Sequence, residues 1–224
     1  MLSLLTLVFV VSGAAGLIYE SIWSRYLSLL VGHSAYAQII VLVIFLGGMS
    51  LGALLVGERS ERLRRPLLTY AGVETAVGVI AQLFNYAYID ISNLAYDRIF
   101  PALAGGWLLV IVKWLLAGVM ILPQSILLGM TFPLMTAGAI RLARGRSGHM
   151  LGLLYFANSL GAAIGVLLAG FVLLQRVGLP GTLVAAAILN FVAAIAIVVI
   201  TIGRARFMPA SMMASSRLLP SRIA

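Results

Sequence analysis

Two carboxylates lie inside apolar stretches of this sequence, where a charge is costly and invites a functional explanation. Glu20 is near the end of the first apolar run, and Glu74 is about two helical turns into the third. Because a carboxylate can accept an amine, we predict that Glu20 and Glu74 are candidate cation- or substrate-binding residues. The structural alternatives are that Glu20 pins a helix end and that hydroxyls of neighbouring helices satisfy Glu74.

Two basic residues accompany these carboxylates. Arg25 follows Glu20 by five residues, which places it to one side on a helix. Lys113 is about two turns into the fourth apolar run, at a different depth from Glu74. We therefore expect Arg25 and Lys113 to be ion-pair partners or structural charges. Asn190, with Asn158, is expected to donate hydrogen bonds between helices.

The residue types that support most enzyme chemistry are missing or scattered. The chain has no cysteine, which excludes disulfides, thiolate metal sites and cysteine nucleophiles. Its two histidines, His33 and His149, fall in different loops, so the sequence has no paired-histidine metal motif. It also has no nucleophile–base pair and no phosphate-binding loop. We expect no catalytic residue, no cofactor and no metal.

The composition indicates a membrane protein. The chain has 224 residues, of which 62% are hydrophobic and 9% charged, whereas soluble domains have about 25% charged residues. Six apolar runs approach the roughly 20 residues that a membrane helix requires, and we take the first as a span rather than a signal peptide. The predicted spans are residues 2–23, 35–57, 67–87, 107–128, 150–174 and 182–202. The fold class is therefore an all-α polytopic membrane domain over residues 1–203.

Arginines between the runs predict the orientation. The net charge of +9 comes largely from clusters in alternate connections, and such clusters mark the cytoplasmic side. The clusters are Arg59, Arg62, Arg64 and Arg65; Arg141, Arg144 and Arg146; and Arg204, Arg206, Arg217 and Arg222. We predict cytoplasmic termini, a flexible tail over 204–224 and a bacterial inner-membrane location. The lipid bilayer explains this charge better than nucleic acid does.

Two segments are harder to assign. Residues 107–140 are apolar but contain Pro123 and Pro133, and one helix of that length would run about 50 Å. We expect a span over 107–128 that kinks near Pro123, followed by a shorter interfacial helix over 131–143. Residues 85–106 have the pattern of an amphipathic surface helix, although an irregular loop is nearly as compatible.

A glycine motif occurs twice. The pattern G-x-x-x-G-x-L-L-x-G begins at Gly48 and again at Gly161. The two copies fall in the second and fifth predicted spans, which run in opposite directions, as expected for an inverted repeat of three plus three helices. Chance is the alternative, since glycine and leucine are common in such helices. The residues assigned to helix packing are Gly48, Gly52, Gly57, Gly161, Gly165 and Gly170.

The end of the second run resembles the major facilitator superfamily, in which a glycine-rich helix end runs into a basic loop. Gly52 and Gly57 are followed here by Arg62, Arg64 and Arg65, while Glu58 or Glu61 replaces the usual aspartate. Half of such a transporter has six helices, so the resemblance implies a half-transporter fold.

A closer resemblance is to the membrane domain of bacterial spermidine-synthase-like proteins, also called fused transporter and spermidine synthase. It rests on four segments in order: Tyr19-Glu20-Ser21-Ile22-Trp23-Ser24-Arg25, Gly48-Met49-Ser50-Leu51-Gly52, Gly129-Met130-Thr131-Phe132-Pro133 and Leu154–Ala162. That family usually adds a soluble aminopropyltransferase-like domain. No glycine-rich loop for an S-adenosyl ligand follows residue 204, so the enzymatic activity is not carried over.

Two functions are compatible with these features. We favour a membrane scaffold or accessory subunit that packs against or anchors a partner protein, or a second copy of itself. The alternative is a transporter-like domain that binds a small cation, such as the polyamine implied by the resemblance, with Glu20 and Glu74 as amine acceptors. Such a half-transporter would have to dimerise.

Overall fold

The chain folds into a bundle of long helices. The computed structural model describes residues 2–103, 106–143 and 147–207, and these residues contain no strand, which agrees with the predicted all-α class. The elements in chain order are α1 (Leu2–Val31), α2 (Ser34–Arg62), α3 (Pro66–Leu94), the π-helix η1 (Ala95–Ile99), α4 (Phe100–Ala102), α5 (Trp107–Ala143), α6 (Ser147–Leu168), the π-helix η2 (Ala169–Leu173) and α7 (Leu174–Phe207).

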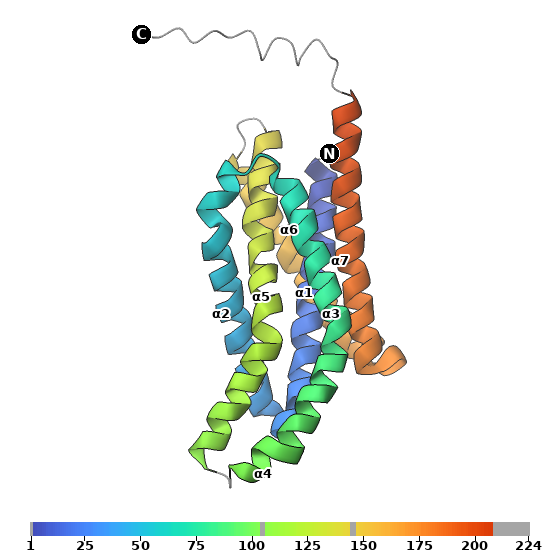
Figure 1. Cartoon of the computed structure of the whole chain (residues 1–224). Helices are drawn as coiled ribbons and strands as arrows, with labels where there is room; N and C mark the ends of the chain where they lie inside the picture. Colours follow the sequence, from blue (N-terminus) through green and yellow to red (C-terminus); the bar gives the residue numbers. More distant parts are fainter. Residues whose placement is uncertain (1, 104–105, 144–146, 208–224) are drawn as a thin grey trace, which may run out of the picture.

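Five helical stretches are long and apolar enough to cross a membrane: Leu2–Val31, Ser34–Arg62, Pro66–Ala102, Trp107–Leu142 and Gly148–Gly203. The last comprises 56 residues and as one straight helix would be about 84 Å long, far more than a bilayer core of about 30 Å. It turns at Gly178, whose φ of 66° lies in the left-handed region that favours glycine. Most of α7 therefore runs back along the bundle (Figure 1).

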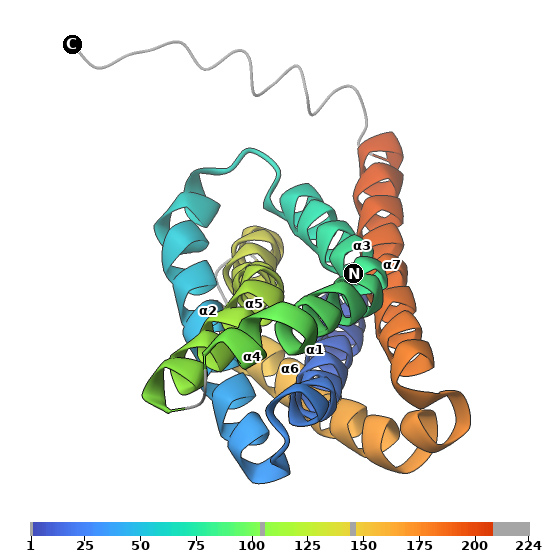
Figure 2. The same cartoon turned by 60° about the horizontal axis from the view of Figure 1, so that its bottom comes forward.

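Helix α1 lies at the centre of the bundle. It packs most extensively against α6 and also contacts α7, α2 and α5, while α2 packs chiefly against α5 and α3 against α7 (Figure 2). Its buried side chains contribute to both hydrophobic clusters of the core. The elements that surround α1 therefore determine the environment of each of its polar residues.

Glycines form the two closest helix contacts. A methyl group at Gly52 would overlap the Ile126 carbonyl of α5, and one at Gly161 would overlap the Val10 carbonyl of α1. A methyl group would also meet Ser125 at Gly48 and the Ala14 carbonyl at Gly165. The predicted packing role thus applies to the first two glycines of each motif. The third glycines, Gly57 and Gly170, have no described neighbour within 4 Å of an added Cβ.

Helix α5 corrects one prediction. It is a single helix of 37 residues that contains both Pro123 and Pro133, so the expected end near residue 128 and the separate interfacial helix over 131–143 are wrong. Packing against α2 and α3 holds the helix together. Packing against neighbouring helices is one of the features that make proline tolerable in membrane helices.

The 85–106 connection continues α3 instead of forming a separate helix. Residues 85–94 belong to α3, and η1 and α4 follow directly. The Tyr96 hydroxyl of η1 donates to the carbonyls of Leu29 and Leu30, at 3.1 and 3.0 Å. These carbonyls belong to the last turn of α1, where a helix has no internal donors. The connection therefore caps the central helix.

The described arginines of the predicted cytoplasmic clusters lie at one end of the bundle. The α2–α3 connection is at the same end as the start of α1 and the end of α7 (Figure 1). Arg141 at the end of α5 donates to the Leu63 carbonyl at 2.7 Å and also to that of Glu61, so it joins the ends of α5 and α2. Arg144, Arg146 and residues 208–224 of the predicted tail lie outside the described residues, whereas residues 204–207 continue α7.

Candidate functional site

Glu74 lies in a hydrogen-bond network that joins three helices. The side chain is fully buried. One carboxylate oxygen accepts from the Ser12 hydroxyl of α1 at 2.5 Å, and the other accepts from the Asn190 amide of α7 at 2.5 Å. The Asn190 carbonyl in turn accepts from the Tyr19 hydroxyl of α1 at 2.6 Å. Both oxygens of Glu74 therefore already have fixed donors.

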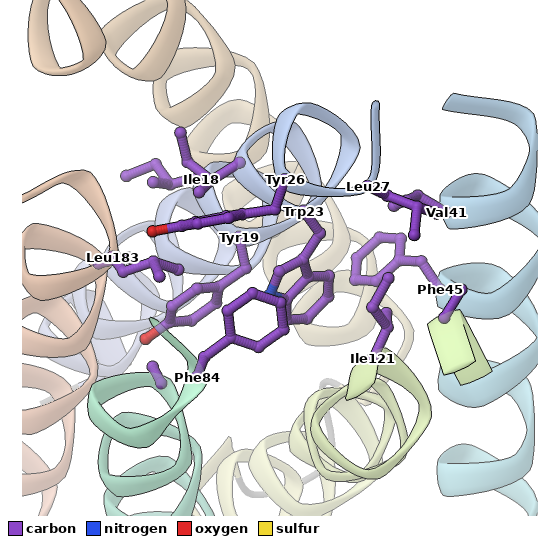
Figure 3. Close-up of a cluster of buried hydrophobic side chains, with 14 of the residues drawn as sticks. Ile18, Tyr19, Trp23, Tyr26, Leu27, Val41, Phe45, Phe84, Ile121 and Leu183 are labelled. Atoms are coloured by element: carbon purple, nitrogen blue, oxygen red, sulfur yellow. The ribbon is translucent and has the colours of Figure 1, made fainter. Parts of the chain in front are cut away.

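Aromatic side chains close the space beside this network. The ring of Tyr19 stacks on that of Trp23 at 5.7 Å, and Trp23 lies 6.1 Å from Phe84 of α3 (Figure 3). Tyr19 and Trp23 are fully buried, as is Tyr70 of α3, whose hydroxyl faces Glu74. Pockets at the two ends of the bundle are lined by other residues. The network is thus enclosed by packed side chains.

Glu20 has a very different environment, although it directly follows Tyr19. It lines an open pocket of about 370 Å³ at the end of the bundle opposite the basic connections. The other polar groups of this pocket are Ser21, Ser24, Arg25, Ser28, Ser34 and Gln38. Ile22, Val166, Ala169 and Gly170 complete the wall. The last two belong to η2, and such π-helical segments frequently occur at functional sites.

The pocket combines one carboxylate with several hydroxyls. Oxygen ligands of this kind suit an ammonium group or another hard cation. Arg25 lines the same pocket and adds a positive charge that would oppose a cation. Between the described side chains no ion pair closer than 4.0 Å is formed, so Glu20 is not neutralised by a direct contact with Arg25.

Lys113 interacts with the end of α1 and is far from being a partner of Glu74. Its ammonium donates to the Val31 carbonyl at 3.1 Å and lies 5.3 Å from the centre of the Phe100 ring. Val31 ends α1, so the charge interacts with the negative end of that helix. Lys113 and Glu74 are not brought together, because Glu74 is bonded to α1 and α7.

Sequence reasoning identified Glu74 and the interhelical role of Asn190, but it did not identify Ser12 or Tyr19 as their partners. Ser12 is 62 positions from Glu74 along the chain, and Asn190 is 116 positions away. Helical spacing does indicate that these two partners lie together, because Ser12 and Tyr19 are seven residues apart and so share a face of α1. The partner helices could not be identified in this way.

Within the described part of the chain, no three His, Cys, Asp or Glu side chains gather in a group that could hold a metal ion. Polar atoms that are buried without a partner include Trp23 Nε1 and Gln124 Oε1, which belong to the tightly packed interior.

No protein-family model, characterised protein or solved structure matches the chain. The geometry around Glu20 and Glu74 is therefore the main evidence on what the protein does.

Proposed function

We propose that the protein is an integral membrane scaffold, an accessory subunit that packs against or anchors a partner protein. The observation that carries this proposal is the enclosed network around Glu74. A carboxylate that moves a cation must exchange partners, whereas both oxygens of Glu74 are held by donors from α1 and α7. The costly buried group is used to fix three helices together, as a rigid scaffold requires.

The proposed topology is six spans, formed by α1, α2, α3, α5, α6 and the part of α7 after Gly178. The packing supports an inverted repeat in which α1, α2 and α3 correspond to α5, α6 and α7. Under this exchange the α1–α6 contact becomes the α5–α2 contact, and α3–α7 maps onto itself. One constant separation along the chain also relates the pairs Gly16/Gly129, Gly48/Gly161, Gly52/Gly165 and Gly57/Gly170.

The proposed orientation has the basic end in the cytoplasm of a bacterial cell, with the protein in the inner membrane. The chain has no cysteine, so single cysteines test this directly. The variants are Arg64→Cys, at an exposed position in the α2–α3 connection, and Arg98→Cys, at an exposed position in η1. The α2–α3 connection and α4, which directly follows η1, lie at opposite ends of the bundle (Figure 1). A membrane-impermeant maleimide added to intact spheroplasts should label the second variant alone. Labelling of Arg64→Cys under the same conditions would contradict the orientation.

The scaffold proposal is tested by photocrosslinking in native membranes. A photoreactive amino acid would be placed at strongly exposed apolar positions: Leu54 of α2, Val119 of α5 and Ile195 of α7. A partner subunit on one face should give one crosslinked product of discrete mass from that face only. A purified particle with the mass of a single chain, 23.8 kDa, together with lipid adducts alone at all three positions, would contradict the proposal.

A second function is favoured by one specific observation, the open pocket around Glu20. In this alternative the domain binds a small organic cation, such as a polyamine, and works as a dimer. Glu20→Gln keeps the shape of the side chain and removes the charge. If the alternative is right, binding of radiolabelled spermidine in proteoliposomes falls at least tenfold in this variant. Equal binding by Glu20→Gln and the unmodified protein would exclude a role for this carboxylate.

A further inference from the structure

A pocket at the basic end combines arginines with an apolar wall. It measures about 270 Å³ and lies where the start of α3 meets the ends of α5 and α7. Arg64, Arg65 and Arg141 contribute its charges. Its wall consists of Pro66, Leu67, Leu68, Gly138, Leu142 and Thr201. Among the residues that the structure describes, no acidic side chain lines this pocket.

We propose that this pocket, which we call the arginine pocket, binds the headgroup of an acidic phospholipid. Guanidinium groups form bidentate hydrogen bonds with phosphate oxygens, and basic pockets between membrane helices suit acidic headgroups. The volume fits a headgroup rather than a whole lipid. The acyl chains would run along the apolar outer surfaces of α3, α5 and α7.

The three arginines differ in their freedom to bind. Arg141 already donates to the main-chain carbonyls of Glu61 and Leu63, so it contributes mainly its charge. Arg64 and Arg65 are exposed in the connection before α3, and no hydrogen bond to another described residue engages either guanidinium. They are therefore the groups that contact the phosphate.

The positions of the acidic residues at this end favour the arginine pocket as the site for an anion. Glu61 lines a separate pocket on the α2 side of Arg141, together with Ser60 and Thr136. Glu58 lies on the outer face of α2, beside Arg59 and Arg62. These carboxylates offset the positive charge there, whereas the described residues in the wall of the arginine pocket include no carboxylate. The charge of this end is thus concentrated between α3, α5 and α7.

The matched variants are Arg64→Gln/Arg65→Gln and Arg59→Gln/Arg62→Gln. Both remove two positive charges from the same end of the bundle, but only the first pair lines the arginine pocket. Native mass spectrometry of the purified full chain would measure binding of dioleoylphosphatidylglycerol and of dioleoylphosphatidylcholine. Inorganic phosphate would be added as the soluble competitor.

The unmodified protein should bind one phosphatidylglycerol at least tenfold more tightly than phosphatidylcholine. Loss of Arg64 and Arg65 should weaken this binding about thirtyfold, on the basis of the usual contribution of a basic residue at an anionic surface. The Arg59/Arg62 pair should change it less than threefold. Equal losses in the two pairs, equal binding of both lipids, or displacement of phosphatidylglycerol by equimolar phosphate would each overturn the proposal.

Two further variants keep the test decisive if the double glutamine variant does not fold. Arg64→Lys/Arg65→Lys retains the charge and removes the guanidinium fork, and should lose about threefold to tenfold. Thr201→Phe places a ring in the pocket while all three arginines remain, and should lose at least fivefold. Unchanged binding in both variants would show that the lipid binds elsewhere.

Discussion

Glu20 and Glu74 are both carboxylates within long apolar helices, yet their surroundings are opposite. Glu74 is fully buried and has a donor for each oxygen, whereas Glu20 lines an open pocket with serines from α1 and α2. The difference begins on α1, where one residue corresponds to a rotation of about 100°. Tyr19 points towards α7 and its neighbour Glu20 points towards the pocket.

This contrast shows that two carboxylates within apolar helices can differ in their access to a ligand. What matters is whether neighbouring helices supply a complete set of partners. Ser12 and Asn190 give each oxygen of Glu74 a donor, and the carboxylate is fully buried among packed side chains. Glu20 has spare acceptor capacity and an opening. A ligand can therefore reach Glu20 without breaking the bundle.

The largest expected difference is in how easily a water-soluble reagent reaches the two sites. Two serines on α1, one beside each carboxylate, allow a matched test. Ser12 is buried against Glu74, whereas Ser24 lines the open pocket. In the cysteine-free chain, Ser24→Cys should react with a small water-soluble methanethiosulfonate at least a hundredfold faster than Ser12→Cys. Rates would be followed by mass spectrometry in detergent and in nanodiscs. Comparable rates would mean that water reaches Glu74, and the enclosed network would be wrong.

The next effect concerns stability. Glu74→Ala removes a buried side chain and leaves the donors of Ser12 and Asn190 without an acceptor, so it should cost about 3–5 kcal/mol. Glu74→Gln preserves the volume and one acceptor, and should cost about 1 kcal/mol. The free energy of unfolding would be measured by steric trapping in bicelles, with Glu20→Ala as the matched control at about 0.5 kcal/mol. A similar cost for Glu74→Ala and Glu20→Ala would remove the distinction between the two sites.

A smaller effect is expected at the edge of the network. Tyr19→Phe removes the hydroxyl that donates to Asn190 and keeps the aromatic stack with Trp23. Hydrogen bonds within membrane proteins contribute about 0.6 kcal/mol on average and at most about 1.7 kcal/mol. Tyr155→Phe is the control, since Tyr155 is exposed on α6. Thermal unfolding followed by circular dichroism should show a lower midpoint for the first variant alone. Equal midpoints would show that the Tyr19 hydroxyl does not stabilise the network.

The sequence was sufficient for features that depend on local pattern. Apolar length predicted the long helices, and glycine spacing predicted that Gly52 and Gly161 serve helix packing, although it did not say which helices they contact. It was insufficient where tertiary packing decides, as at Pro133, which lies inside a continuous α5 because α2 and α3 pack against that helix. The same limit applies to the carboxylates: a sequence places Glu20 and Glu74 in helices, but only the fold selects which one receives Asn190.

The smallest expected effect is the most informative about Glu20. Because its pocket is open, Glu20→Gln should change the free energy of unfolding by less than about 0.5 kcal/mol, as is usual for substitutions outside the core. A stability loss above about 1.5 kcal/mol would instead indicate that Glu20 holds α1 against α6, and that the pocket is part of the packing. A neutral result would show that the Glu20 carboxylate is not needed for packing. Together with its open pocket, that would make Glu20 a better candidate than Glu74 for binding a cation.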